Sequence, residues 1–243
     1  MKRWLSAALL LVVVALGVAL VARRPGEPRS TSLLQTRTLH GARVDVVELP
    51  LDQWDVRITW LPGGTRLSAL EGAVRTNAGI FEPGFTPTGL LVSGGEQLRP
   101  LRTAQGEGNF YLLPNGVFTL GEEGAAVVEA SEYDPRGVKG ATQSGPLLVR
   151  RGELHPAFKR FSDNKLLRSG VGVRGRTVVL MISRDEINFW TFASIFRDDL
   201  DCPDALYLDG VISALWAKDA GREADLGLGP FAGVITASPR GSR

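Results

Sequence analysis

Short runs of alternating apolar and polar residues recur along most of the chain. Gly, Pro or Asn bounds most of these runs, which is the pattern of β-strands joined by tight turns. We therefore expect an α+β fold with mixed or antiparallel sheets and few helices. The pattern predicts strands at 42–49, 55–61, 75–81, 125–129, 205–208 and 231–237, hairpins at 90–98, 110–120, 141–154 and 170–182, and a short helix at 65–70.

Helical spacing is clear in only one long segment. Apolar residues recur every three or four positions from Phe189 to Leu200, and Pro203 ends the pattern. The helix has two possible N-terminal caps, either Asn188 or a capping box that begins at Ser183. The segment predicts one amphipathic helix that packs on a sheet.

The N-terminal segment differs from the rest of the chain. Two basic residues on each side flank an apolar run at 4–22, which predicts either a secretory signal or a membrane anchor at 1–24. Residues 25–38 are rich in Pro, Arg and Ser and are predicted to be a linker. We expect residues 39–243 to form one extracytoplasmic domain, periplasmic or at the cell surface, which is secreted or held at the membrane by the N-terminal segment.

Composition excludes several functional classes. The net charge is only +2 over 243 residues, with no long basic block, so no nucleic-acid partner is expected. His40 and His155 stand far apart and Cys202 is the single cysteine, which gives no metal motif, disulfide or redox pair. We expect no cofactor; a metal stays open, because acids are plentiful but no ligand spacing demands one. We interpret Cys202 as a small buried residue.

Four stretches place a glycine beside a polar residue at the end of an apolar run. They are TNAGIFEP, ATQSGPLLV, LLRSGVGV and YLDGVIS. Glycine permits close approach of a backbone to a ligand, and polar side chains at strand ends commonly build sites. Each stretch alone also fits a turn, a bulge, a surface hydroxyl or a solvated ion pair. Their candidate site residues are Asn77, Gly79, Phe81, Gln143, Ser144, Gly145, Arg168, Asp209, Gly210 and Ser213, and our hypothesis is that these residues converge on one cleft.

These stretches also carry a resemblance. TNAGIFEPGFTPTGLLV, GNFYLLPNGVF, ATQSGPLLV, RSGVGV and DALYLDGVIS, in this order, resemble the phosphodiester glycosidase family, whose domain occurs in the lysosomal uncovering enzyme. The resemblance covers about residues 40–240 and is strongest to a bacterial branch of envelope proteins. It implies a hydrolase that cuts the bond from the anomeric carbon to oxygen in a sugar-1-phosphodiester, in envelope or extracellular glycans.

The resemblance implies roles for the candidate residues. Arg168 would bridge two phosphate oxygens, and Asp209 would stabilise an oxocarbenium-like sugar or activate water. Glu82 is the nearest candidate for a second catalytic carboxylate. The substrate-binding candidates would hold hydroxyls or phosphate oxygens, with Phe81 as an apolar wall: Asn77, Gly79, Phe81, Gln143, Ser144, Gly145, Gly210 and Ser213.

The sequence also departs from the family's pattern. Val211 and Ile212 stand where the family has glycines, and two β-branched residues there would narrow the pocket or reshape the loop. The alternative interpretation is therefore a non-catalytic envelope module that binds a carbohydrate or phosphate. A third is an envelope assembly factor that uses the same surface for protein contact.

Overall fold

The computed structural model describes residues 32–210, 212–220 and 229–241. The predicted signal or anchor at 1–24 lies outside these residues. Within the described ranges, no helix is long and apolar enough to cross a membrane.

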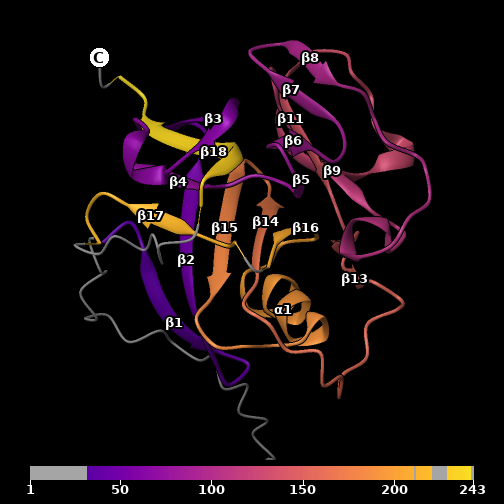
Figure 1. The fold of residues 1–243 in the computed structure, drawn as a ribbon. Helices are drawn as coiled ribbons and strands as arrows, with labels where there is room; N and C mark the ends of the chain where they lie inside the picture. The colour runs from indigo at the N-terminus through magenta and orange to yellow at the C-terminus, as the bar shows by residue number, and fades with distance from the viewer. Residues whose placement is uncertain (1–31, 211, 221–228, 242–243) are drawn as a thin grey trace, which may run out of the picture. The chain divides into compact units, whose positions relative to one another are not determined.

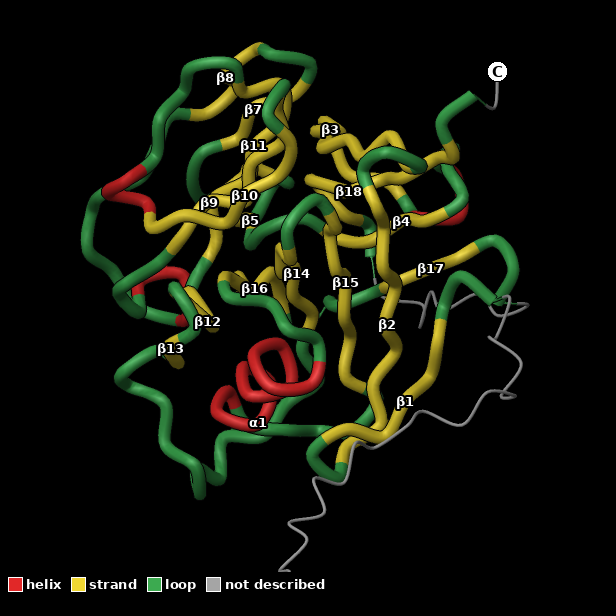
Figure 2. Tube along the Cα trace, turned by 180° about the vertical axis from the view of Figure 1, so that it is seen from behind, coloured by secondary structure: helices red, strands yellow, loops and turns green. Residues whose placement is uncertain are grey.

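The largest sheet has seven antiparallel strands (Figures 1 and 2). Their order across the sheet is β1-β2-β15-β14-β16-β12-β13. Neighbours in this order are joined by antiparallel ladders. The strands are β1 (Gln35–Leu39), β2 (Ala42–Pro50), β12 (Leu147–Arg150), β13 (Glu153–Leu154), β14 (Ser169–Arg174), β15 (Thr177–Ser183) and β16 (Asp204–Asp209).

Three smaller sheets complete the strand structure of the described residues. A five-stranded sheet has the order β10-β9-β11-β7-β8, a four-stranded sheet has the order β17-β4-β18-β3, and β5 pairs with β6. Their strands are β3 (Trp54–Thr65), β4 (Val74–Asn77), β5 (Phe81–Glu82), β6 (Thr86–Pro87), β7 (Leu91–Ser93), β8 (Glu96–Arg99), β9 (Gly116–Gly121), β10 (Gly124–Glu129), β11 (Val138–Ser144), β17 (Leu215–Ala217) and β18 (Phe231–Pro239). The expected antiparallel sheets are therefore present, and the fold is mostly β.

The predicted amphipathic helix is present beside β14 and β16 (Figures 1 and 2). It consists of α1 (Phe189–Ser194) and the π-helical turn η4 (Ile195–Asp199). The Asn188 side chain accepts a hydrogen bond from the Thr191 N–H at 2.9 Å, so Asn188 is the N-cap. Three single 3-10 turns are the other described helical segments: η1 (Leu67–Ala69), η2 (Asn109–Tyr111) and η3 (Ala130–Glu132).

Four boundaries differ from the sequence prediction. The expected hairpin at 110–120 is wrong, because 109–111 forms a 3-10 turn and β9 pairs with β10 across a turn at 122–123. The expected linker overlaps β1, which joins the sheet from Gln35 onward. The predicted helix at 65–70 is a single 3-10 turn, and the predicted strand at 75–81 ends at Asn77.

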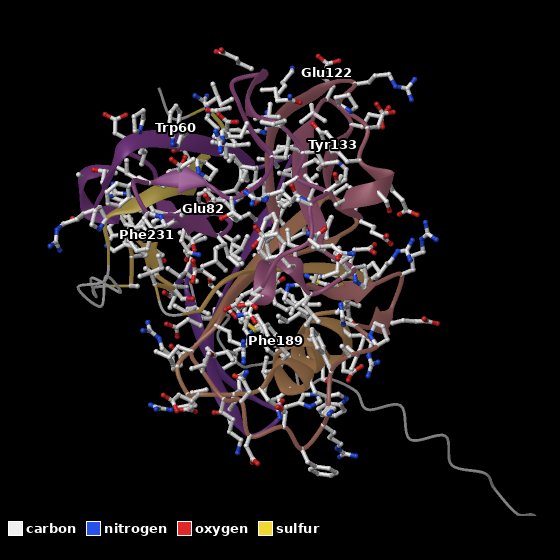
Figure 3. All side chains as sticks on the ribbon, turned by 45° about the vertical axis from the view of Figure 1, so that its right-hand side comes forward. Trp60, Glu82, Glu122, Tyr133, Phe189 and Phe231 are labelled. Carbon is white, nitrogen blue, oxygen red and sulfur yellow. The ribbon has the colours of Figure 1, made fainter. Side chains whose placement is uncertain are left out.

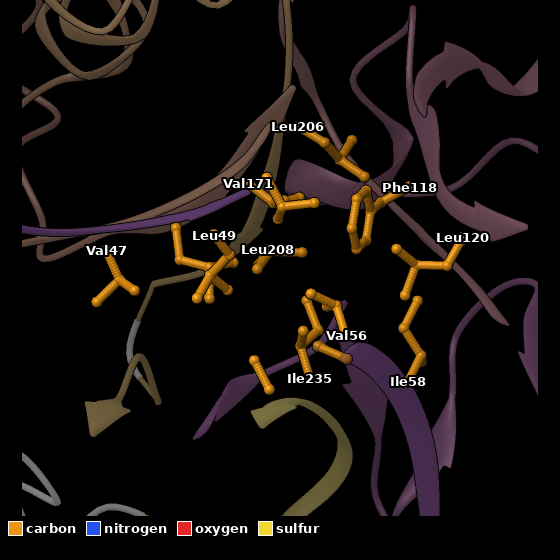
Figure 4. Packing of buried hydrophobic residues seen from close by; sticks show 14 of the residues in the cluster. Val47, Leu49, Val56, Ile58, Phe118, Leu120, Val171, Leu206, Leu208 and Ile235 are labelled. Atoms are coloured by element: carbon orange, nitrogen blue, oxygen red, sulfur yellow. The ribbon is translucent and has the colours of Figure 1, made fainter. Parts of the chain in front are cut away.

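The main hydrophobic core joins the three larger sheets (Figure 4). Leu206 and Leu208 of β16 meet Phe118 of the five-stranded sheet and Ile235 of the four-stranded sheet, and all four are buried. Each such side chain contributes about 1.5–3 kcal/mol through burial. The alternate residue Tyr207 packs on the opposite face, in the cluster that includes α1. This packing brings the ends of β4, β11 and β16 together beside the start of β14.

Candidate functional site

A cavity of about 400 Å³ opens beside the end of β16. It contains four of the residues predicted from sequence, namely Phe81, Glu82, Asp209 and Gly210. Its complete lining is Ile80, Phe81, Glu82, Pro83, Thr88, Glu107, Gly108, Asn109, Phe110, Tyr111, Leu166, Tyr207, Asp209 and Gly210. Segments that are distant in sequence therefore share one hollow.

The Asp209 carboxyl group has a raised pKa. Burial raises the pKa of Asp209 to about 6, although the backbone N–H groups of Gly210 and Ile212 favour its charged form. The N–H of Gly210 donates to Asp209 Oδ1 at 2.6 Å. At neutral pH the group is mostly ionised yet accepts a proton readily, which suits a general base.

A buried network of hydrogen bonds holds the backbone of Asp209 in place. Ser169 Oγ accepts from the Asp209 N–H at 3.2 Å, and Asn77 Nδ2 donates to the same oxygen at 3.0 Å. Ser213 Oγ donates to the Asp209 carbonyl oxygen at 2.7 Å. The Asn77 Oδ1 accepts from the Ala214 N–H at 3.1 Å. Asn77 and Ser213 thus converge on Asp209, but their polar atoms are engaged with protein groups and line no part of the cavity.

Glu82, labelled in Figure 3, lines the same cavity from β5. Its carboxylate accepts from Arg102 Nη1 at 3.0 Å, and the Glu82 side chain remains 43% exposed. Arg102 Nη1 also lies 3.4 Å from the Thr88 carbonyl oxygen, and the guanidinium stands 5.5 Å from the centre of the Tyr111 ring. Arg102, which the sequence did not single out, therefore contacts two residues that line this cavity, Glu82 and Tyr111.

Arg168 does not line the cavity. Its side chain is fully buried, and Nε donates to the Ile187 carbonyl oxygen at 2.8 Å while Nη2 donates to the Asn164 carbonyl oxygen at 3.1 Å. The guanidinium lies 3.7 Å above the centre of the Phe189 ring, which Figure 3 labels at the start of α1. Burial lowers the pKa of Arg168 from its usual value. Arg168 therefore does not reach a phosphate bound in this cavity, contrary to the role expected from sequence.

Gln143 and Ser144 hold chain segments together. Gln143 Oε1 accepts from the N–H groups of Leu90 and Arg102 at 3.0 and 2.9 Å, and Nε2 donates to the Arg102 carbonyl oxygen at 2.8 Å. Ser144 Oγ donates to the Leu208 carbonyl oxygen at 3.1 Å. These side chains position the loop that carries Arg102 and the end of β16, and neither lines the cavity.

Gly79 and Gly145 are sites of close packing. A Cβ on Gly79 would lie 2.5 Å from the carbonyl oxygen of Gln143, and one on Gly145 would lie 2.6 Å from the carbonyl oxygen of Phe110. The close neighbours are backbone atoms, so these glycines admit another chain segment where a ligand was expected.

Tyr207 is a residue of the cavity that the sequence reasoning missed. Its hydroxyl lies next to Gly210, where an added Cβ would be 2.5 Å from Tyr207 Oη. Burial and the Asp209 charge raise the pKa of Tyr207, while Arg168 and Asn109 act in the opposite direction. Strand alternation was the available signal, because Tyr207 precedes Asp209 by two positions and residues i and i+2 share a face.

Of the two residues expected to narrow the pocket, Val211 and Ile212, Val211 lies outside the described residues. Ile212 is partly buried and packs on a small apolar cluster that includes Leu67, Phe231 and Val234. It is absent from the cavity lining. At this position the side chain packs into the apolar cluster and not into the cavity.

Other chemistry is limited in the described parts of the chain. They contain no group of three His, Cys, Asp or Glu residues arranged to hold a metal ion. Burial raises the pKa of Cys202 to about 12, which keeps it a thiol. A larger cavity of about 840 Å³ includes Arg102 and His155 but none of the candidate residues predicted from sequence. We place the site in the smaller cavity because Asp209 and Glu82 both line it.

Comparison with protein families gives a match over most of the domain. The model of a family described as phosphodiester glycosidase matches residues 70–227. The uncharacterized protein YigE of Escherichia coli K12 is 33% identical over 144 residues, which are 58% of this chain. The aligned part spans 57% of the length of that protein.

Two solved structures share the fold. The catalytic domain of zebrafish N-acetylglucosamine-1-phosphodiester alpha-N-acetylglucosaminidase, auto-inhibited by its pro-peptide, matches with a TM-score of 0.59 and 15% identity, covering 88% of this chain and 86% of that one. A hypothetical protein from Synechocystis matches with a TM-score of 0.56 and 14% identity, covering 84% and 61%. At these identities the likeness concerns the fold alone.

Proposed function

Since the chain belongs to the phosphodiester glycosidase family, we propose that it hydrolyses the glycosidic bond of a sugar-1-phosphodiester in envelope or extracellular glycans. One observation carries the proposal. The Asp209 carboxyl, with a pKa raised to about 6, stands in a cavity that also holds the Glu82 carboxyl, the hydrogen-bond partner of Arg102.

The proposed reaction makes modest demands on the protein. A phosphate leaving group is a weak base, so it departs from the anomeric carbon without full protonation. The site must instead stabilise positive charge on the sugar and activate water. Asp209 takes the proton from the attacking water as that oxygen bonds to the anomeric carbon. The electrons of the broken bond remain on the phosphate oxygen.

Arg102 is the residue we assign to the phosphate. A guanidinium can bridge two phosphate oxygens, and Arg102 already holds an anionic group, the Glu82 carboxylate. An entering phosphate would compete with Glu82 for this guanidinium. Glu82 would then be released toward the sugar, where a second carboxylate stabilises the oxocarbenium-like transition state.

We also propose an extracytoplasmic location. The basic and apolar pattern of residues 1–24 supports export, with the domain either secreted or attached to the membrane.

A second candidate function is a non-catalytic module that binds the same anionic sugars. The burial of Arg168 favours it, because the residue expected to grip phosphate is withdrawn from the cavity. This leaves Arg102, beside Glu82 and Tyr111, as the candidate for the phosphate contact.

One assay separates the two functions. Full-length protein is incubated with a UDP-sugar and with a glycan phosphodiester, and free sugar is measured beside the Asp209→Asn variant. Release by the wild type and its loss in the variant are expected. Binding of a sugar phosphate without release from any substrate would support the non-catalytic module, and equal release by the variant would remove Asp209 from the mechanism.

A further inference from the structure

The Tyr207 hydroxyl forms part of the cavity wall. It lies against the backbone of Gly210, directly after the Asp209 carboxylate in the chain. The remainder of the side chain is rigidly held, since the Tyr207 ring meets the Phe189 ring edge-on at 4.9 Å between centres and the residue is 1% exposed. The hydroxyl is thus a fixed polar group at the reacting end of the cavity.

Arg168 supports this hydroxyl from the protein interior. Its guanidinium carbon is 5.8 Å from the centre of the Tyr207 ring, and its charge acts on the Tyr207 hydroxyl. Arg168 forms no ion pair with the described residues, and its Nη1 is buried without a regular hydrogen-bond partner. A buried cation without a carboxylate costs several kcal/mol, which favours a role beyond packing.

We propose that the Tyr207 hydroxyl donates a hydrogen bond to the phosphate oxygen that leaves the anomeric carbon, and that Arg168 is a positioning residue that orients this hydroxyl. Arginine has only donors. Its N–H groups can therefore approach only the Tyr207 oxygen, which turns the hydroxyl hydrogen toward the cavity. The inference rests on the proposed function and deepens it.

No proton needs to leave Tyr207 in this step. The bond between the anomeric carbon and the phosphate oxygen breaks, and its electron pair stays on that oxygen. The hydrogen bond from Tyr207 becomes stronger as negative charge gathers there, so it favours the transition state over the bound substrate. The product is a phosphate monoester, and the water proton goes to Asp209.

The direct test is the Tyr207→Phe variant with the same sugar-1-phosphodiester substrate. We expect kcat to fall about 100-fold with little change in KM, since one oriented donor to a developing oxyanion is worth about 10²–10³ in kcat. Tyr133→Phe is the matched control. Its hydroxyl is also buried but lies away from this cavity (Figure 3), and we expect unchanged kinetics. A Tyr207→Phe enzyme with wild-type kcat would overturn the inference.

A double-mutant cycle tests the role of Arg168. Arg168→Met is expected to lower kcat in the wild-type background and to have no further effect in the Tyr207→Phe background, because Arg168 acts only through that hydroxyl. If the double variant instead shows the product of the two separate losses in kcat, Arg168 has only a structural role, and its assignment as a positioning residue is overturned. Arg168→Lys gives the same cycle where Arg168→Met does not fold.

The two proposals fail in different ways. Wild-type protein that releases no sugar from any phosphodiester would overturn the proposed function, and the inference with it. Wild-type release with normal kinetics in Tyr207→Phe would overturn the inference alone.

Discussion

The side-chain hydroxyl of Ser169 binds both polar backbone atoms of Asp209, accepting from its N–H and donating to its carbonyl oxygen at 3.2 Å each. The ladder between β14 and β16 changes register between Ser169 and Gly170. A side chain thus completes the pairing at this irregularity, as is common where a bulge redirects a functional residue. The direction of the Asp209 carboxylate depends on this contact.

Ser169→Ala should therefore affect both stability and turnover. The change leaves the buried Nδ2 of Asn77 and the Asp209 N–H without this acceptor, and each such loss costs about 1–3 kcal/mol. We expect a fall of that size in the free energy of unfolding, measured with urea, and a lower kcat in the surviving folded protein. Ser131→Ala removes an exposed hydroxyl and should change stability by less than about 0.5 kcal/mol. Equal stability of the two variants would contradict the account.

Glu82→Gln should lower kcat/KM by about 10²-fold or more if Glu82 acts on the sugar. The amide keeps the shape of the side chain but cannot stabilise a positive charge. Glu122→Gln is the control, because Glu122 is 73% exposed, pairs with Lys139 and is remote from the cavity (Figure 3). Equal sugar release by the wild type and both variants would exclude a catalytic role for Glu82.

Gly210→Ala should destabilise the protein by about 1–3 kcal/mol, the usual cost of overpacking. The new Cβ would stand 2.5 Å from Tyr207 Oη, and its next neighbour is the Leu167 carbonyl oxygen at 3.3 Å. Adding Tyr207→Phe removes the hydroxyl and should recover most of the loss, as measured by the unfolding midpoint. Gly140→Ala is the control, since its nearest neighbours lie at 3.5 Å or more. Failure of the second change to rescue the first would show that the hydroxyl lies elsewhere.

Asp209 also makes stability depend on pH. Its pKa is about 6 in the folded protein, against about 3.9 for an unfolded Asp. Folding therefore favours the protonated carboxyl, and the wild type loses this contribution as pH rises from about 4 to 6. Asp209→Asn should be more stable than the wild type at pH 8 by about 3 kcal/mol, with the difference vanishing near pH 3.5.

Urea unfolding at several pH values measures this difference. Asp52→Asn, at an exposed residue, controls for the loss of one charge. A stability difference between wild type and Asp209→Asn that stays constant from pH 3.5 to 8 would contradict the burial of the Asp209 carboxyl.

Local patterns in the sequence predicted most of the strands and the helix. The turns at Gly94-Gly95, Arg151-Gly152 and Gly175 carry their own signals, and the structure has hairpins there. The order of strands across each sheet could not be predicted, because neighbours such as β2 and β15, or β14 and β16, pair through contacts far apart in sequence. The hairpin prediction for residues 110–120 was wrong because the Pro114-Asn115-Gly116 turn signal leads into β9 and does not close a hairpin.

The candidate site was predicted in part, for a definable reason. Glycine and polar residues at strand ends marked where Asp209 and Asn77 approach each other. The same pattern could not separate a side chain that faces the cavity, such as Glu82, from one consumed by internal hydrogen bonds, such as Gln143. Arg102 was missed because it lies in an irregular loop whose position depends on Gln143.

Hydrolysis in ¹⁸O-labelled water tests most directly whether the glycosidic bond is cut. The full-length protein and its Asp209→Asn variant are given a sugar-1-phosphodiester, and the phosphate product is analysed by mass spectrometry. We predict that the wild type releases an unlabelled phosphate monoester, because water attacks the anomeric carbon, and that the variant releases almost none. ¹⁸O in the phosphate product would show attack at phosphorus and contradict this prediction.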